Sequence, residues 1–145
     1  MTWSALTEKQ KGYIAGFIDA DGSITISKQR QSGGVYYRPV LHIYNNSQRI
    51  LENIASNLTE DVEYYVDKRR DSRHNQDTYV LQIRRQEELR KALKNIEPYL
   101  KLKQDQAQKV IQVIDLIQDR DSHAYTDDLR TKLQKHHKEI KVMND

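Results

Sequence analysis

The amino-acid sequence predicts an α+β domain in which two β-hairpins form a four-stranded antiparallel sheet with helices packed on one face. Apolar residues change twice from helical spacing to the two-residue spacing of a strand and back. Only two prolines and five glycines interrupt the 145 residues, so regular structure should dominate. With 37% hydrophobic and 31% charged residues, the chain can bury one thin core. Strand pairs that alternate with helices in this order favour the α+β class.

The first predicted element is a helix from Thr7 to Asp21. Thr7 and Gln10 form a capping-box pattern, in which a hydroxyl and an amide three residues later satisfy each other's backbone N–H groups. Gly22 follows as a stop signal. The apolar residues at helical spacing between these signals are Tyr13, Ile14, Phe17 and Ile18.

A β-hairpin and a second helix come next. Apolar and small polar residues alternate over 23–27, and alternation returns over 41–44 after a Ser-Gly-Gly turn at 32–34. Pro39 indicates an edge or bulge position. Either Asn46 or Ser47 can cap the helix that follows. Its apolar positions are Ile50, Leu51, Ile54 and Leu58.

The second half of the chain repeats the hairpin and adds helices. The elements predicted there are strands at about 62–68 and 78–84 and helices at about 87–96 and 103–118. From Ala124 onward the apolar periodicity is weak and charges are frequent, so we expect a partly helical, peripheral tail. We therefore expect a single domain over 1–145, with a core at about 8–118 and a tail at about 119–145.

Composition excludes several classes of protein. The absence of cysteine excludes disulfides, thiolate metal sites and cysteine nucleophiles. No apolar run approaches the ~20 residues that cross a bilayer, and residues 1–11 lack a signal-peptide pattern, so we expect an intracellular protein with no membrane partner. A Gly-rich phosphate loop is absent, and the spacing of the five histidines fits no zinc signature.

Charge is unevenly distributed along the chain. The formal net charge of +3 and pI near 9.0 are weak indications of a nucleic-acid partner. Residues 68–94, however, contain nine basic and four acidic residues, a local excess of +5. A basic cluster beside a sheet fits contacts with phosphates. A solvated helix face would explain part of the same cluster.

One face of the predicted sheet is mostly polar. Because side chains alternate along a strand, the residues opposite the apolar set carry amides, hydroxyls and guanidinium groups, which are the groups that read base edges in the major groove. Ordinary solvated strands would show the same alternation, but the adjacent basic cluster favours DNA. The candidate DNA-binding residues are Thr25, Ser27, Gln29, Arg38, His42, Asp67, Arg69, Arg70, Gln82 and Arg84.

The strongest local signal is the segment 14–22, which ends in Asp19-Ala20-Asp21-Gly22. Two carboxylates at a helix C-terminus oppose the macrodipole, at a cost of roughly 0.3–1 kcal/mol each. A divalent cation such as Mg²⁺ or Ca²⁺ would reverse this penalty, because hard oxygen ligands suit both ions. The alternative is a helix that simply ends in an Asp-rich turn.

Small residues recur on the same helix at Gly12, Gly16 and Ala20, which permits the close approach of another helix. The chain contains one copy of this stripe. A symmetric pair of chains would supply the second copy and place two Asp21 carboxylates side by side. Such a pair with bound metal is compatible with phosphodiester cleavage of the two-metal kind.

The segment 14–22 resembles the LAGLIDADG motif of the homing endonucleases. It matches the motif at residues 15, 16 and 18–22, whereas Ile14 and Phe17 replace leucines. The predicted order of elements is that of the αββαββα core of this family. In addition, residues 98–106 (PYLKLKQDQ) resemble a segment of the small, single-motif members encoded by group I introns. The resemblance covers about residues 8–118.

The resemblance implies a role for each matching residue. Asp21 would bind the catalytic Mg²⁺ with the Ala20 carbonyl nearby, and Ca²⁺ or Mn²⁺ would substitute for binding or activity. Lys103 would activate the hydrolytic water, Arg49 would lie at the periphery of the site, and Asn45 stands where relatives often have a water-positioning glutamine. Asp19 would be structural, bonding within the helix interface. The implied homodimer interface comprises Gly12, Tyr13, Gly16, Phe17, Asp19 and Ala20.

The sequence thus predicts a Mg²⁺-dependent, site-specific endonuclease that acts as a homodimer on double-stranded DNA. Its target would be long and pseudo-palindromic, and cleavage would leave 3′ overhangs. The expected location is a prokaryotic cytoplasm or an organelle. Two alternatives stay open at this point: a non-cleaving relative such as an intron maturase or regulator, and a monomer whose sheet face binds RNA.

Overall fold

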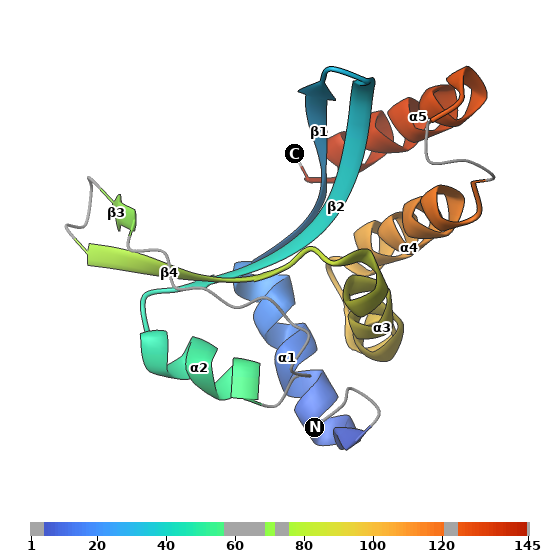
Figure 1. Cartoon of the computed structure of the whole chain (residues 1–145). Coiled ribbons are helices and arrows are strands. Elements are labelled where there is room, and N and C mark those ends of the chain that lie inside the picture. The colour runs from blue at the N-terminus through green and yellow to red at the C-terminus, as the bar shows by residue number, and fades with distance from the viewer. Residues whose placement is uncertain (1–4, 57–68, 72–75, 121–124, 145) are drawn as a thin grey trace.

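The computed structural model describes residues 5–56, 69–71, 76–120 and 125–144 (Figure 1). For residues 69–71 and 76–77 only the backbone is described. The elements, in chain order, are α1 (Glu8–Asp21), β1 (Gly22–Gln31), β2 (Gly34–Asn45), α2 (Gln48–Ser56), β3 (Arg69–Asp71), β4 (Gln76–Ile83), α3 (Gln86–Ile96), the 3₁₀ turn Glu97–Tyr99, α4 (Gln104–Gln118) and α5 (Asp127–Asn144). Among the described helices, none is long and apolar enough to span a bilayer.

The four strands form one antiparallel sheet in the order β1-β2-β4-β3. Figure 1 shows that the sheet is strongly curved, with the described helices on its convex side and none of them over its concave side. The predicted α+β fold with a saddle-shaped, four-stranded sheet is therefore confirmed. The strand predicted at 62–68 lies outside the described residues, and β3 begins directly after it.

Strand register places most apolar residues of the three long strands on the helix-covered face, whereas Val40 lines the opposite, concave face. Ile24 is paired with Leu41, and Ile43 with Leu81, so these side chains share one face as alternation requires. The core that they form with the helices includes Ile14 and Ile18 of α1 and is fully shielded from solvent at most positions. This face is held in place by burial of apolar side chains, each contributing about 1.5–3 kcal/mol.

Pro39 lies in β2, a strand with neighbours on both sides over part of its length. Its partner in β1 is Ile26, but the pairing of β2 with β4 stops at Leu41. Residues 34–40 of β2 therefore form an edge strand on the β4 side. Such a position suits Pro39, which has no N–H group to donate. The outer half of the β1–β2 hairpin thus extends past the rest of the sheet.

Both ends of α1 follow from local chemistry. The Thr7 Oγ1 atom accepts a hydrogen bond from the Gln10 N–H (3.1 Å), and the Thr7 N–H donates to Gln10 Oε1 (2.8 Å), which confirms the capping box. At the other end Gly22 is extended and starts β1. A Cβ atom there would lie 2.8 Å from the backbone of Ile18, so the glycine permits a close helix-to-strand junction.

Ser47, rather than Asn46, caps α2. Its Oγ accepts a hydrogen bond from the Ile50 N–H at 3.3 Å. The sequence left this choice open because both residue types cap helices well.

The C-terminal helix α5 is longer and better packed than its weak apolar pattern indicated. Leu129, Leu133 and Ile140 are buried in the same core as the sheet, where we expected a peripheral tail. At its end, Asn144 Nδ2 donates to the Ile24 carbonyl of β1 at 3.0 Å. Figure 1 shows α5 on the convex side of the sheet, beside the β1–β2 hairpin.

A half-buried histidine on α5 should make stability depend on pH. His136 Nδ1 is buried without a hydrogen-bond partner in the described part of the chain. Burial, followed by the charge of Lys109, lowers the pKa of His136 from its ordinary 6.5; Lys135 lowers it further and Glu139 opposes the shift. The neighbouring His137, whose ring packs on Tyr37, has its pKa lowered chiefly by burial.

The unfolded chain binds protons at these two histidines more readily than the folded chain does. The stability that the neutral histidines contribute is therefore fully present above pH 6.5 and is lost as the pH falls through their folded-state pKa. We expect the free energy of unfolding to decrease between pH 7.5 and pH 5.5, and His136→Gln to reduce that decrease. Urea unfolding at the two pH values measures both. An identical pH dependence in the variant would contradict the assignment to His136.

Candidate active site and nucleic-acid interface

The two acids of the 14–22 motif have different environments. The carboxylate of Asp19 accepts three backbone hydrogen bonds, from the N–H groups of Lys101 (2.8 Å), Leu102 (3.2 Å) and Lys103 (3.0 Å). Lys103 is the N-cap of α4 but provides no side-chain cap itself. Asp19 therefore caps α4 from a distant part of the chain, where its negative charge also complements the helix dipole.

Within one chain, the hydrogen bonds of Asp19 join α1 to the 101–103 segment, more than 80 residues away in sequence. The expected bonding of Asp19 within an interface between two motif helices stays a prediction. Asp19 thus fixes the relative position of the motif helix and α4.

Lys103 lies at the same end of α1. Its Nζ donates a 2.8 Å hydrogen bond to the Asp19 carbonyl. Carbonyls in the last turn of a helix lack intrahelical partners, and a cation there is favoured by the dipole. The structure therefore brings the Lys103 ammonium to the last turn of the helix that ends in Asp21.

Asp21, the last residue of α1, is exposed and has no hydrogen-bond or ion-pair partner among the described residues. Ala20 beside it is also exposed. A carboxylate together with backbone carbonyls at a helix end forms a set of hard oxygen donors, which is the set that Mg²⁺ and Ca²⁺ prefer. These residues therefore fit a divalent cation, with Asp21 as its ligand and the Ala20 carbonyl as an accessible second donor.

Asn45 ends β2, two residues past the Gly22–Ile43 pair, and so lies near the junction of α1 and β1. Its Oδ1 accepts a hydrogen bond from the Ser47 N–H at 2.7 Å. The amide oxygen is thus used in the turn that begins α2.

Arg49 occupies a different region. It is exposed on α2 and lines a groove together with Tyr13 of α1 and with Ile50, Glu52 and Asn53. Tyr13 precedes Asp21 by eight residues, about 12 Å along a helix. Among the described contacts, none joins Arg49 to Asp21, so the site built around Asp21 comprises Ala20, Lys103 and, at its edge, Asn45.

The remaining predicted interface residues lie on an open face of α1. A Cβ atom placed at Gly12 or Gly16 would meet no atom within 4 Å. Tyr13 is 55% exposed, and its ring lies 5.6 Å from that of Phe17. Small residues and an exposed aromatic pair form a surface against which a second helix could pack closely.

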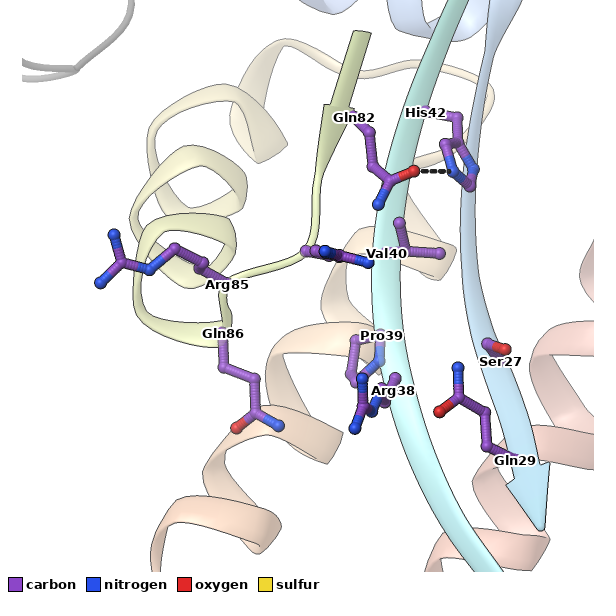
Figure 2. Close-up of a pocket in the computed structure, with 10 residues that line it drawn as sticks. Ser27, Gln29, Arg38, Pro39, Val40, His42, Gln82, Arg85 and Gln86 are labelled. Carbon is purple, nitrogen blue, oxygen red and sulfur yellow. Dashed lines mark hydrogen bonds between the residues drawn. The ribbon is translucent and has the colours of Figure 1, made fainter. Parts of the chain in front are cut away.

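The concave face of the sheet carries a shallow hollow of about 510 Å³ (Figure 2). Six candidate DNA-binding residues line it: Ser27, Gln29, Arg38, His42, Gln82 and Arg84. Figure 2 shows His42 and Gln82 joined by a 3.0 Å hydrogen bond at one end, with Gln29 and Arg38 at the other. Thr25, paired with Val40, shares this face.

Two lining residues were missing from the sequence-based set. Arg85 and Gln86 follow directly after β4, at the start of α3, and both line the hollow. Their location in the basic stretch 68–94 indicated a possible DNA contact. The candidates were chosen by strand alternation, which does not extend into a helix. Of the other candidates, Asp67 lies outside the described residues, and the side chains of Arg69 and Arg70 are not described.

The basic stretch 68–94 divides between two environments. Arg84 and Arg85 lie at the concave face. Arg90 instead pairs with Asp115 of α4 at 2.7 Å, which raises the pKa of its guanidinium, and Lys91 lies 3.6 Å from Glu88. The solvated-helix interpretation is therefore correct for this part of α3.

The curved antiparallel sheet with a polar, arginine-bearing concave face, together with a helix that ends in an exposed acid, suits a nucleic-acid-binding protein. The chain belongs to the LAGLIDADG family: the model of a LAGLIDADG-like domain matches residues 8–97. No relative was found among curated protein sequences.

Solved structures share the fold over nearly the whole chain. The homing endonuclease I-CvuI, in complex with the I-CreI target, superposes with a TM-score of 0.80 at 22% identity, covering 95% of this chain and 83% of that one. The archaeal intron-encoded homing endonuclease I-Vdi141I, complexed with DNA, gives 0.76 at 23% identity and covers 95% and 86%. The group I intron-encoded I-CeuI, complexed with DNA, gives 0.72 at 21% identity and covers 92% and 67%.

Replacing Asp19 with Asn should destabilise the chain. The substitution keeps the size but puts an amide N–H₂ in place of one oxygen that accepts backbone N–H groups. Hydrogen bonds to a charged group contribute about 1.5–3 kcal/mol, so we expect the free energy of unfolding to fall by about 2–3 kcal/mol in urea titrations. Asp105→Asn, an exposed acid in the first turn of α4, is the matched control and should cost under about 1 kcal/mol. Equal losses in the two variants would contradict the capping role.

Proposed function

We propose that this chain is a site-specific double-strand DNA endonuclease that acts as a homodimer with Mg²⁺. The observation that carries the proposal is the exposed Asp21 carboxylate at the end of a glycine-faced helix, whose last turn also holds the Lys103 ammonium at the Asp19 carbonyl. A carboxylate unused by the fold, next to a cation and a polar concave sheet, suits binding a metal at a DNA phosphate. The family and the DNA complexes of its structural neighbours support this function.

The concave sheet supplies the means of reading DNA. Its side chains include two donors of bidentate hydrogen bonds, Arg38 and Arg84, and the amides of Gln29 and Gln82. Arginine pairs with guanine, and glutamine with adenine, with about 1–3 kcal/mol of discrimination for each good bidentate pair. Because each base pair contributes only modest discrimination, a specific target must be long.

Two chains complete the site. Packing of two α1 helices along Gly12 and Gly16 places two Asp21 carboxylates at a common axis, and each sheet then reads one half of a pseudo-palindromic target. Asp21 would hold the metal with the Ala20 carbonyl, and Ca²⁺ or Mn²⁺ can replace Mg²⁺. When bound, the metal polarises the scissile phosphate and activates water.

The residues of the chain itself position the reactants. Lys103 places a positive charge where the phosphate approaches, and Asp19 holds Lys103 in position by capping α4. Arginines at the concave face fix the duplex through phosphates and base edges. Cleavage of both strands across the minor groove would leave 3′ overhangs.

One observation favours a second function. The Asn45 amide oxygen accepts the Ser47 N–H in the turn to α2, so one of its two acceptor positions is used and the amide is held toward α2. A family member that binds DNA or RNA without cleaving, such as an intron maturase or regulator, would have this property.

Cleavage-site selection separates the two functions. A library of plasmids with randomised inserts is incubated with the chain and Mg²⁺, and linearised molecules are sequenced. We expect a single pseudo-palindromic motif with staggered 3′ ends that depends on added metal. Plasmids that stay intact but are retained on the immobilised chain are sequenced as well, and their enrichment would support a binding protein. No enrichment of either kind would refute both DNA functions.

A further inference from the structure

The tip of the β1–β2 hairpin is held by an arginine from the C-terminal helix. Arg130 of α5 donates from Nη2 to the Gly33 carbonyl at 2.9 Å and from Nε to the Val35 carbonyl at 3.4 Å. The donor and its acceptors are more than 90 residues apart in sequence. One guanidinium therefore bridges both sides of the turn.

The local structure is built around this guanidinium. Its Cζ lies 5.9 Å from the ring centre of Tyr36 and 6.0 Å from that of Tyr125, and the two rings are 4.9 Å apart. Such cation–π contacts stabilise a fixed orientation of the charge. Gly34 has φ of +120°, and a Cβ atom there would lie 2.5 Å from Arg130 Nη2. The glycine is thus needed for both the turn and the arginine.

The held segment is the part of the hairpin with the least support from the sheet. β4 pairs with β2 only between Leu41 and Asn45, so no further strand of the described part of the chain lies beside the outer hairpin. α5 lies along β1. Arg130 near its start contacts the hairpin tip, and Asn144 at its end donates to the Ile24 carbonyl. A helix of 18 residues spans about 27 Å, close to the length of a ten-residue strand.

We propose that Arg130 is a positioning residue that fixes the outer half of the β1–β2 hairpin and thereby sets base discrimination at the outer end of each DNA half-site. The inference rests on the proposed function. Ser27, Gln29 and Arg38 belong to this outer half and line the concave hollow. The tip is about 30 Å from Gly22, or about nine base pairs of duplex, so the affected positions are those farthest from the cut.

The first arm of the test needs no DNA. Hydrogen exchange is measured for amides 32–36 in the wild-type chain, in Arg130→Ala and in Lys132→Ala, which removes an exposed α5 cation paired with Asp128. We expect exchange at the tip to accelerate about tenfold in Arg130→Ala only, with the unfolding midpoint nearly unchanged because the buried face of α5 remains. Equal exchange in all three proteins would overturn the proposal.

The second arm uses the target found by cleavage-site selection. Every base pair of one half-site is substituted in turn, and the affinity of each chain is measured. We expect Arg130→Ala to lose about tenfold discrimination at the outer positions, to keep it at the central ones, and to cleave saturating target at the wild-type rate. Arg130→Lys should restore discrimination only partly, because an ammonium cannot make the two-pronged contact.

The outcomes are distinguishable. A uniform loss of affinity at all positions would show a merely structural role and overturn the proposal. If the wild-type chain selects no target, the proposed function fails and the specificity inference fails with it, whereas the exchange experiment still reports whether Arg130 holds the hairpin.

Discussion

Asp21→Asn is expected to abolish DNA cleavage while leaving DNA binding almost intact. The substitution removes the negative oxygen that suits a divalent cation, and the loss of metal polarisation is worth several kcal/mol in the transition state. We therefore expect the cleavage rate to fall by about 10³-fold or more. Binding should stay within about threefold of wild type, because the concave face is separate from Asp21. Single-turnover cleavage and fluorescence anisotropy on the selected target measure the two quantities.

The matched control is Asp119→Asn, an exposed acid just after α4. It removes the same charge far from the motif and should cleave normally. Cleavage by Asp21→Asn within tenfold of wild type would contradict the assignment of Asp21 as the metal ligand. Parallel loss of binding and cleavage would place Asp21 in DNA contact instead.

Gly16→Leu should separate folding from activity. In the isolated chain a side chain at this position meets no atom within 4 Å, and leucine favours a helix by up to about 1 kcal/mol over glycine. The unfolding free energy should therefore stay constant or rise. Two α1 helices, in contrast, could no longer approach each other, so we expect a single-chain mass in sedimentation and at least a hundredfold slower cleavage, roughly a loss of 3 kcal/mol.

Gln112→Leu, which adds the same side chain to an exposed position of α4, is the control for added apolar surface. It should leave both mass and cleavage unchanged. A Gly16→Leu chain that still sediments as a dimer and cleaves would show that α1 does not form the shared axis.

Local chemistry explains why much of the fold could be predicted from the sequence. The capping box set the start of α1, and strand alternation separated the core face from the concave face, as the pairing of Ile24 with Leu41 and of His42 with Gln82 confirms. Both signals involve neighbours within a few residues. The extent of the strands was underestimated because β1 and β2 continue into the polar hairpin, where the apolar pattern ends.

Interactions between distant segments could not be predicted in the same way. The bonds of Asp19 to the 101–103 segment depend on packing of α1 against α3 and the 3₁₀ turn Glu97–Tyr99, and nothing in the motif itself indicates them. The role of α5 was underestimated because only a narrow stripe, Leu129, Leu133 and Ile140, is buried along 18 residues. Arg130 acts on a turn almost 100 residues earlier, a contact that only the tertiary structure defines.

The most direct test of a shared active site is double-strand cleavage by mixed dimers. Wild-type and Asp21→Asn chains are coexpressed in equal amounts, purified together and compared with wild type at equal total concentration on a plasmid carrying the selected target. If each double-strand break needs Asp21 from both chains, the rate of linear product should be about a quarter of the wild-type rate, the fraction of wild-type dimers. A rate near one half, expected when each chain acts alone, would contradict the account.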